Sequence, residues 1–149
     1  MKAVLNPYLI FNGNCAKAMK FYQSILGGKL TMSTYAESGA TQYKDAQDKI
    51  IHAKLDNDLL TFMASDDNEA QKVVSGTNVQ MSISGDSTET LTKYFNKLAA
   101  GGKVFLPLSK QFWGDTFGML TDKFRIHWMV NITGKKYLQL QIHFQNYII

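Results

Sequence analysis

The chain has 149 residues, of which 45% are hydrophobic and 19% are charged, and this composition excludes a disordered protein. No apolar stretch is long enough to cross a membrane, and residues 1–7 lack the apolar core of a signal peptide, so we expect no membrane partner. The net charge of +4 arises in residues 101–149 without a dense basic run, so we expect no nucleic-acid partner. A single cysteine excludes an internal disulfide and favours a cytoplasmic protein.

The first half of the chain predicts one helix and four strands. In chain order these are a strand at 5–11, a helix at 15–26, and strands at 29–36, 49–55 and 59–64. We expect Asn14 to cap the helix with its side chain, and the glycines at 27 and 28 to end it.

The same order of patterns recurs in the second half. The helix end Leu26-Gly27-Gly28-Lys29 reappears 74 residues later as Ala100-Gly101-Gly102-Lys103. The predicted elements here are a strand at 77–84, a capping turn at 85–87, a helix at 88–100, and strands at 103–108, 112–120 and 125–132. A repeat of this length indicates a duplicated module with a cleft between the two copies.

We therefore predict a single α+β domain, residues 1–149, built from two modules. Its parts are module one at about 5–65, a polar connector at 66–76, module two at about 77–132 and a C-terminal extension at 133–149. Apolar and polar residues alternate in the extension, which favours a strand that pairs with a sheet edge or with a partner chain; a disordered extension is the alternative.

Several separated motifs resemble those of one family. They are Pro7-Tyr8-Leu9-Ile10-Phe11-Asn12-Gly13-Asn14, Phe21-Tyr22, Leu26-Gly27-Gly28, His52-Ala53-Lys54-Leu55, Trp113-Gly114, Asp122-Lys123-Phe124 and Trp128-Met129-Val130. The chain resembles the vicinal oxygen chelate superfamily of glyoxalases, bleomycin resistance proteins and dioxygenases, and within it the PhnB-like branch. The resemblance implies two βαβββ modules, a mixed curved sheet around a cleft, and a homodimer. Because the fold hosts many reactions, it does not imply one of them.

Metal-dependent members of this superfamily hold a divalent ion in the cleft with His, Glu or Gln. The corresponding positions here are Pro7, Gln80 or Met81, and Met129, and the matching strand of module one offers Thr61 and Met63. Thioethers are poor ligands for hard or borderline cations. We therefore predict no cofactor and no metal ligands, with a divalent metal as the less favoured alternative.

Two residues are candidates for acid–base catalysis. His52 is expected opposite Ile51, Ala53 and Leu55, which face the helix, and its alternative role is a hydrogen-bonded strand residue. Asp115 lies among apolar groups that would raise its pKa; its alternative roles are to cap a loop or to pair with a lysine.

A second group of residues is expected to line a ligand pocket: Gln80, Trp113, Phe117, His127 and Met129. The alternative for the aromatic and thioether stripe is an ordinary core, and Trp128 is assigned to the core. Arg125 stands at the family's turn glycine and would be strained if that turn needs a positive φ.

These expectations combine into a PhnB-like protein that binds a small organic ligand in the cleft, with catalysis left open. One alternative is a metal-dependent lyase, isomerase or dioxygenase, and another is a ligand-sequestering resistance protein. Methyl transfer is not supported, because no glycine-rich nucleotide loop follows the first strand.

Overall fold

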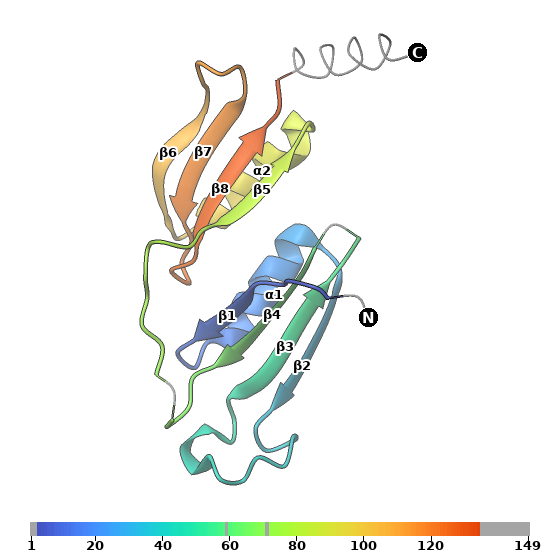
Figure 1. Cartoon of the computed structure of the whole chain (residues 1–149), viewed down its shortest axis with the longest axis vertical. Coiled ribbons are helices and arrows are strands. Elements are labelled where there is room, and N and C mark those ends of the chain that lie inside the picture. Colours follow the sequence, from blue (N-terminus) through green and yellow to red (C-terminus); the bar gives the residue numbers. More distant parts are fainter. Residues whose placement is uncertain (1–2, 59, 71, 135–149) are drawn as a thin grey trace. The chain divides into compact units, whose positions relative to one another are not determined.

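The computed structural model describes residues 3–58, 60–70 and 72–134. The chain divides into two compact units, Met1–Ser75 and Gly76–Ile149, and each is considered by itself (Figure 1). The division falls inside the connector that the sequence predicts at 66–76. The cleft expected between the modules stays a prediction. None of the helices in the described ranges is both long enough and apolar enough to cross a membrane.

The first unit contains one α-helix and a four-stranded sheet. In chain order its elements are β1 (Tyr8–Phe11), α1 (Cys15–Leu26), β2 (Lys29–Thr34), the 3₁₀-helix η1 (Lys44–Ala46), β3 (Ile50–Asp56) and β4 (Thr61–Asp66). The strand order is β1-β4-β3-β2. The pair β1–β4 is parallel and the other pairs are antiparallel, so the sheet is mixed, as expected.

The second unit repeats this topology. Its elements are β5 (Met81–Gly85), α2 (Thr88–Ala99), β6 (Lys103–Lys110), β7 (Thr116–Thr121) and β8 (His127–Ile132). The strand order β5-β8-β7-β6 matches that of the first sheet strand for strand, and β5–β8 is again the parallel pair. Two βαβββ modules in an α+β fold are thereby confirmed.

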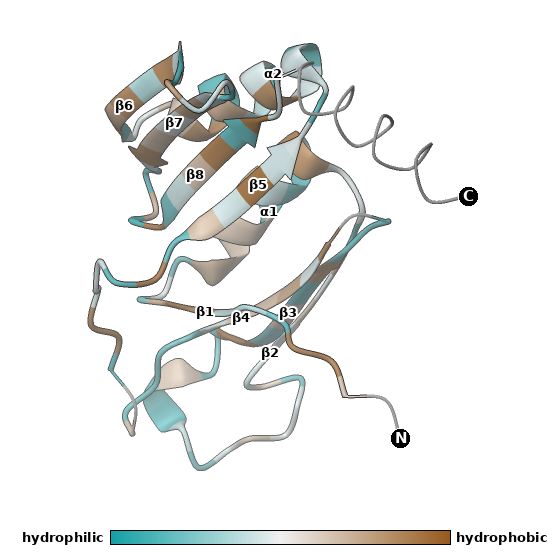
Figure 2. Cartoon of the chain, turned by 45° about the horizontal axis from the view of Figure 1, so that its top comes forward, coloured by the Kyte–Doolittle hydropathy of each residue, from teal (hydrophilic) through white to brown (hydrophobic). Residues whose placement is uncertain are grey.

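In each unit the helix covers one face of its own sheet (Figure 1). Tyr22 and Ile25 on α1 are buried with Leu55 and Phe62 of the sheet, and the rings of Tyr22 and Phe62 meet edge to face at 5.7 Å. On α2 the buried side chains are Leu91, Phe95 and Leu98. Along β5 the hydropathy alternates from residue to residue, as expected for a strand with one covered face (Figure 2).

The repeated glycine pair has a structural reason. A Cβ atom on Gly28 would lie 2.6 Å from the carbonyl oxygen of Asp56, and one on Gly102 would clash in the same way with that of Thr121. Each second glycine therefore lets its strand start closely against the hairpin turn of its own sheet. Asp56 and Thr121 consequently occupy equivalent positions in the two modules.

Six strands begin later than the sequence predicts, β3 by one residue and β8 by two (His127 rather than 125). β1 begins at Tyr8 rather than 5, β4 at Thr61 rather than 59, β5 at Met81 rather than 77, and β7 at Thr116 rather than 112. The apolar pattern extends into segments that have no partner strand in the described structure, where Leu5 is 98% exposed and Val79 is 76% exposed. Alternation therefore predicted strand type correctly and placed most strand starts too early, while β6 extends to Lys110, past the predicted 108.

The two helix caps differ from each other. Ser87 caps α2 as expected, because its side chain accepts a hydrogen bond from the backbone N–H of Thr90. The prediction for Asn14 is wrong, since its side chain makes no capping hydrogen bond. The carboxylate of Asp66 replaces it and accepts a hydrogen bond of 2.8 Å from the backbone N–H of Cys15.

Two further expectations concern the C-terminal end, and the structure tests the first of them. Arg125 adopts a φ of 70°, so the turn does need the positive φ that glycine supplies at lower cost. The strand predicted in the extension falls on 135–149, which lie outside the described residues. Before them, Thr133 continues the pairing of the sheet by donating a backbone hydrogen bond to Gly85.

Candidate functional site

Each sheet has one face that its helix does not cover, here called the open face. In the second unit, β8 turns Trp128, Val130 and Ile132 to α2, and all three are buried. The alternate residues of β8 therefore lie on the open face, and the strand register adds their partners. The open face of the second sheet comprises His127, Met129 and Asn131 of β8, Phe117, Met119 and Thr121 of β7, and Ser82 and Ser84 of β5.

Apolar side chains gather near the centre of this open face. Met119 and Met129 are Cα partners across β7 and β8, and Phe117 lies two residues before Met119. The ring of Trp113 meets that of Phe117 at a centroid distance of 6.0 Å. Trp113 itself lies in the turn before β7, not within a strand, and is 40% exposed. The stripe is thus a partly exposed sheet surface and not the helix-covered core.

Polar side chains occupy one end of the same face. The hydroxyl of Thr121 and Nδ1 of His127 are 2.7 Å apart. The choice between Gln80 and Met81 as the counterpart of Pro7 is resolved by register. Tyr8 opposite Met63 corresponds to Ser82 opposite Met129, so Pro7 corresponds to Met81, which pairs with Trp128 and lies on the helix side. Alternate residues of an extended chain lie on the same face, so Gln80, one residue before Met81, is expected on the open face together with Ser82.

Asp115 has a structural setting. Its carboxylate accepts hydrogen bonds from the side-chain amide of Asn131, at 2.9 Å, and from the backbone N–H of Gly134, at 3.0 Å. These two hydrogen bonds lower the pKa of Asp115 below its ordinary value of 3.8. The direction of this shift speaks against the acid–base role with a raised pKa, and the contacts agree with the structural role, in which Asp115 holds a loop. An acid with a lowered pKa is a poor proton donor near neutral pH.

His52 lies on the open face of the first sheet. The residues of β3 expected to face the helix need one correction: Ile50 is buried in place of Ile51, together with Ala53 and Leu55. The reason is an irregularity in the pairing of β2 with β3 between Ser33 and Thr34. The imidazole of His52 is exposed and its ring centroid lies 6.2 Å from that of Tyr8. His52 and His127 belong to different units, so the structure supports no joint role for them.

The side chains at the family's metal positions do not fit a metal. Met63 of β4 and Met129 of β8 are equivalent, since each lies three residues before the end of its strand. On the first strands, the expected positions Pro7 and Met81 come one residue before Tyr8 and Ser82, which register puts opposite Met63 and Met129. Thioethers with a phenol and a hydroxyl are unsuited to zinc, magnesium or manganese. Among the described residues no three His, Cys, Asp or Glu side chains cluster.

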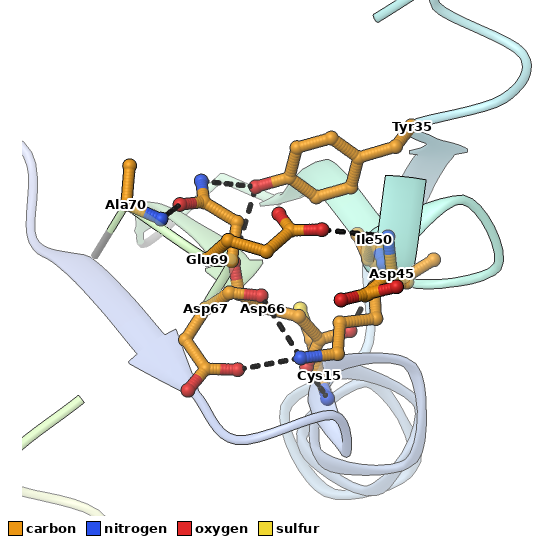
Figure 3. A network of polar contacts seen from close by, with 10 residues as sticks. Cys15, Tyr35, Asp45, Ile50, Asp66, Asp67, Glu69 and Ala70 are labelled. Atoms are coloured by element: carbon orange, nitrogen blue, oxygen red, sulfur yellow. Dashed lines mark hydrogen bonds and ion pairs between the residues drawn. The ribbon is translucent and has the colours of Figure 1, made fainter. Parts of the chain in front are cut away.

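A buried polar junction in the first unit was not foreseen (Figure 3). Asp66 accepts hydrogen bonds from the backbone N–H groups of Cys15 and Ile50, and Lys49 forms a 2.8 Å ion pair with Asp67. Burial, reinforced by the charge of Asp66, raises the pKa of the Cys15 thiol to about 12. Backbone N–H groups fill the carboxylate of Asp66 and the ammonium of Lys49 pairs with that of Asp67, so the junction holds the fold together. The raised pKa keeps the Cys15 thiol protonated.

Sequence reasoning also missed two partners on the open face. Thr121 was assigned only to a turn, yet its hydroxyl is hydrogen-bonded to His127. Asn131 was not singled out, yet its side-chain amide donates a hydrogen bond to Asp115. No fixed offset in the sequence pairs Thr121 with Asp56; their equivalence comes from the structure, where the carbonyl oxygen of each lies against the second glycine of its module.

Comparisons with known proteins agree with this architecture. The family model described as the Glyoxalase/Bleomycin resistance protein/Dioxygenase superfamily matches residues 4–130. Protein YjdN of Escherichia coli (strain K12) is 32% identical over 146 residues, which cover 89% of this chain and 97% of that protein.

Solved structures give the same result. The crystal structure of protein PA1353 from Pseudomonas aeruginosa is 38% identical with a TM-score of 0.79, and the match covers 90% of this chain and 100% of that one. A putative 3-demethylubiquinone-9 3-methyltransferase, PhnB protein, from Bacillus cereus shares the fold at 24% identity and a TM-score of 0.71, over 88% of this chain and 100% of that one.

Proposed function

Because the chain belongs to the glyoxalase/bleomycin resistance protein/dioxygenase superfamily, we propose that it binds a small organic molecule on the open face of its second sheet, without the metal of the superfamily. The observation that carries the proposal is the apolar group formed by Trp113, Phe117, Met119 and Met129 on a face that α2 does not cover. Ligand sites are typically apolar surfaces with a few directed polar groups.

The composition of this surface favours a planar or flexible apolar ligand. Trp113 and Phe117 meet at an interplanar angle of 63°, which leaves ring surface for stacking. Met119 and Met129 have unbranched, polarizable side chains that adapt to ligands of different shape. Thr121, His127 and Asn131 provide hydrogen bonds at the margins of the apolar group and would orient the ligand.

The metal-dependent alternative is less well supported by the side chains present. The family positions hold Pro7, Met81, Met63 and Met129, and Tyr8 and Ser82 lie opposite the last two. These side chains lack the carboxylates and imidazoles that a hard or borderline cation needs. The proposal therefore assigns recognition to apolar contact and hydrogen bonding.

A fragment screen tests the proposal. The full chain is screened by thermal shift against small aromatic and aliphatic compounds in buffer with EDTA and again with zinc or manganese. We expect hits that raise Tm equally in both buffers. Met129→Lys and Trp113→Ala should remove the shifts, whereas Val74→Ala, at an exposed connector position, should retain them. Hits that require metal, or that survive both substitutions, would overturn the proposal.

The homodimer and the cytoplasmic location are further proposals. β6 is an edge strand of the second sheet, and its Val104 and Phe105 are exposed apolar residues that a second copy would cover. Light scattering on the purified chain should give twice the 16.8 kDa chain mass; a single-chain mass at micromolar concentration would contradict the dimer.

A further inference from the structure

A row of polar side chains crosses one end of the second sheet on its open face. Lys103 of β6 and Thr121 of β7 are Cα partners, and Thr121 and His127 of β8 are partners in turn. Gln80 continues the row beside His127, because the next residues, Met81 and Trp128, pair in β5–β8. We call Gln80, His127, Thr121 and Lys103 the polar row.

The first unit contains the equivalent row with one chemical difference. Lys29, Asp56 and Thr61 are successive partners across β2, β3 and β4, just as Lys103, Thr121 and His127 are across β6, β7 and β8. Each lysine follows its glycine pair directly. The first row therefore has a carboxylate at the position where the second has a hydroxyl.

In the first unit the carboxylate of Asp56 accepts hydrogen bonds from neighbouring side chains. Asp56 accepts hydrogen bonds from the hydroxyl of Thr61 and, at 3.0 Å, from the ammonium of Lys54. These contacts, with the charges of Lys54 and Lys29, lower the pKa of Asp56, so it is an anion at neutral pH. The first row thus contains an anion, which pairs with the neighbouring Lys54 and is also influenced by the charge of Lys29.

The second row has no such anion. Within the described ranges Lys103 forms no ion pair, and its ammonium lies 5.1 Å from the centroid of the Phe105 ring. The acid nearest in sequence to Thr121 is Asp122, which is 3% exposed. Its carboxylate accepts hydrogen bonds from the backbone N–H groups of Phe124 and Ile126 and from Nε1 of Trp128, on the helix side.

We infer that the polar row binds the anionic end of an organic acid whose apolar body lies on Met119 and Met129. This rests on the proposed function and specifies its ligand class. Adjacent rows of a strand are about 7 Å apart, so a carboxylate near Lys103 and His127 leaves the rest of a small acid over the two methionines. Thr121, His127 and Gln80 offer hydrogen-bond donors, and Lys103 supplies the charge.

The experiment compares an acid with its uncharged isostere, 4-phenylbutyrate with 4-phenylbutanamide. Binding to the full chain is followed by NMR through the backbone amides of β7 and β8. We expect the acid to bind roughly five- to tenfold more tightly than the amide, with a preference that declines as salt is added. Lys103→Met and Thr121→Asp should bring the two affinities together, the second by supplying the internal carboxylate seen in the first unit.

The control is Lys110→Met, which removes one charge from the other end of β6 and should leave the preference intact. The Tm of each variant shows whether it is folded. If Thr121→Asp does not fold, Lys103→Met alone tests the inference. Equal binding of acid and amide at Met119 and Met129 would overturn the inference and leave the proposed function standing. Failure of both compounds to perturb β7 and β8 at about 10 mM would overturn both.

Discussion

The carboxylate of Asp66 accepts a hydrogen bond of 2.8 Å from the backbone N–H of Cys15, 51 residues earlier in the chain. Its other oxygen accepts one of 2.9 Å from the backbone N–H of Ile50. One buried side chain therefore caps α1, meets the start of β3 and ends β4, and so ties the first helix to the last two strands of its unit (Figure 3).

Replacing this acid should destabilise the first unit strongly. Asp66→Ala leaves two buried backbone N–H groups without their acceptor, so we expect a loss of about 2–4 kcal/mol in the free energy of unfolding. Chemical denaturation measures it. Asp48→Ala, at an exposed acid in the same unit, is the control and should change the stability by less than about 0.5 kcal/mol. Equal losses in the two variants would contradict the role assigned to Asp66.

Cys15 should be unreactive in the folded protein. Burial and the charge of Asp66 raise the pKa of its thiol to about 12, so almost no thiolate is present at pH 8. We expect a disulfide reagent to label the folded chain at least about a thousandfold more slowly than the chain in guanidinium. Rapid labelling of the folded protein at pH 8 would show that the helix start is open.

Arg125 is strained, and the strain can be relieved. Its φ of 70° is one that glycine adopts readily, so Arg125→Gly should stabilise the second unit by about 1 kcal/mol. Lys123→Gly in the same turn relieves no positive φ and should be neutral or destabilising. Thermal unfolding distinguishes the two variants, and a lower Tm for Arg125→Gly would refute the strain.

The contribution of Asp115 to stability should depend on pH. Hydrogen bonds from Asn131 and Gly134 lower its pKa from 3.8, so its contribution to stability is present above that pH and is lost as the pH falls through the lowered value. The stability difference between the wild type and Asp115→Asn should therefore be largest near pH 7 and shrink in acid. Denaturation at pH 7 and at pH 3 provides the test; a difference that grows on acidification would contradict the direction of the shift.

The sequence predicted the helices closely because their determinants are local. Residues 15–26 were predicted to within a residue, and α2 ends one residue before the predicted 100. The apolar stripe and the following glycines lie within the segment itself. Ser87 acts on its own helix start, so it was also predictable.

The failures concern interactions between distant residues. Leu5 and Val79 continue an alternating pattern but lie outside the paired strands, and pairing cannot be read from one segment. Asn14 has the right chemistry for a cap, yet Asp66 at the end of β4, 51 residues after Cys15, performs the function.

The candidate site was predictable in part for the same reason. The period of two placed His127 and Met129 on one face of β8 correctly. It could not show that Asp115 meets Asn131 or that His127 meets Thr121, because these contacts depend on strand register.

The most direct test of ligand binding on the open face uses methionine methyl groups as reporters. Met119 and Met129 lie on the open face of the second sheet, whereas Met19 is fully buried in the first unit and Met81 faces α2. With ¹³C-methyl methionine in the full chain, we predict that bound fragments shift the methyl signals of Met119 and Met129, without added metal, and leave those of Met19 and Met81 in place. Fragments that shift only Met19 or Met81, or that bind only after a divalent metal is added, would contradict the account.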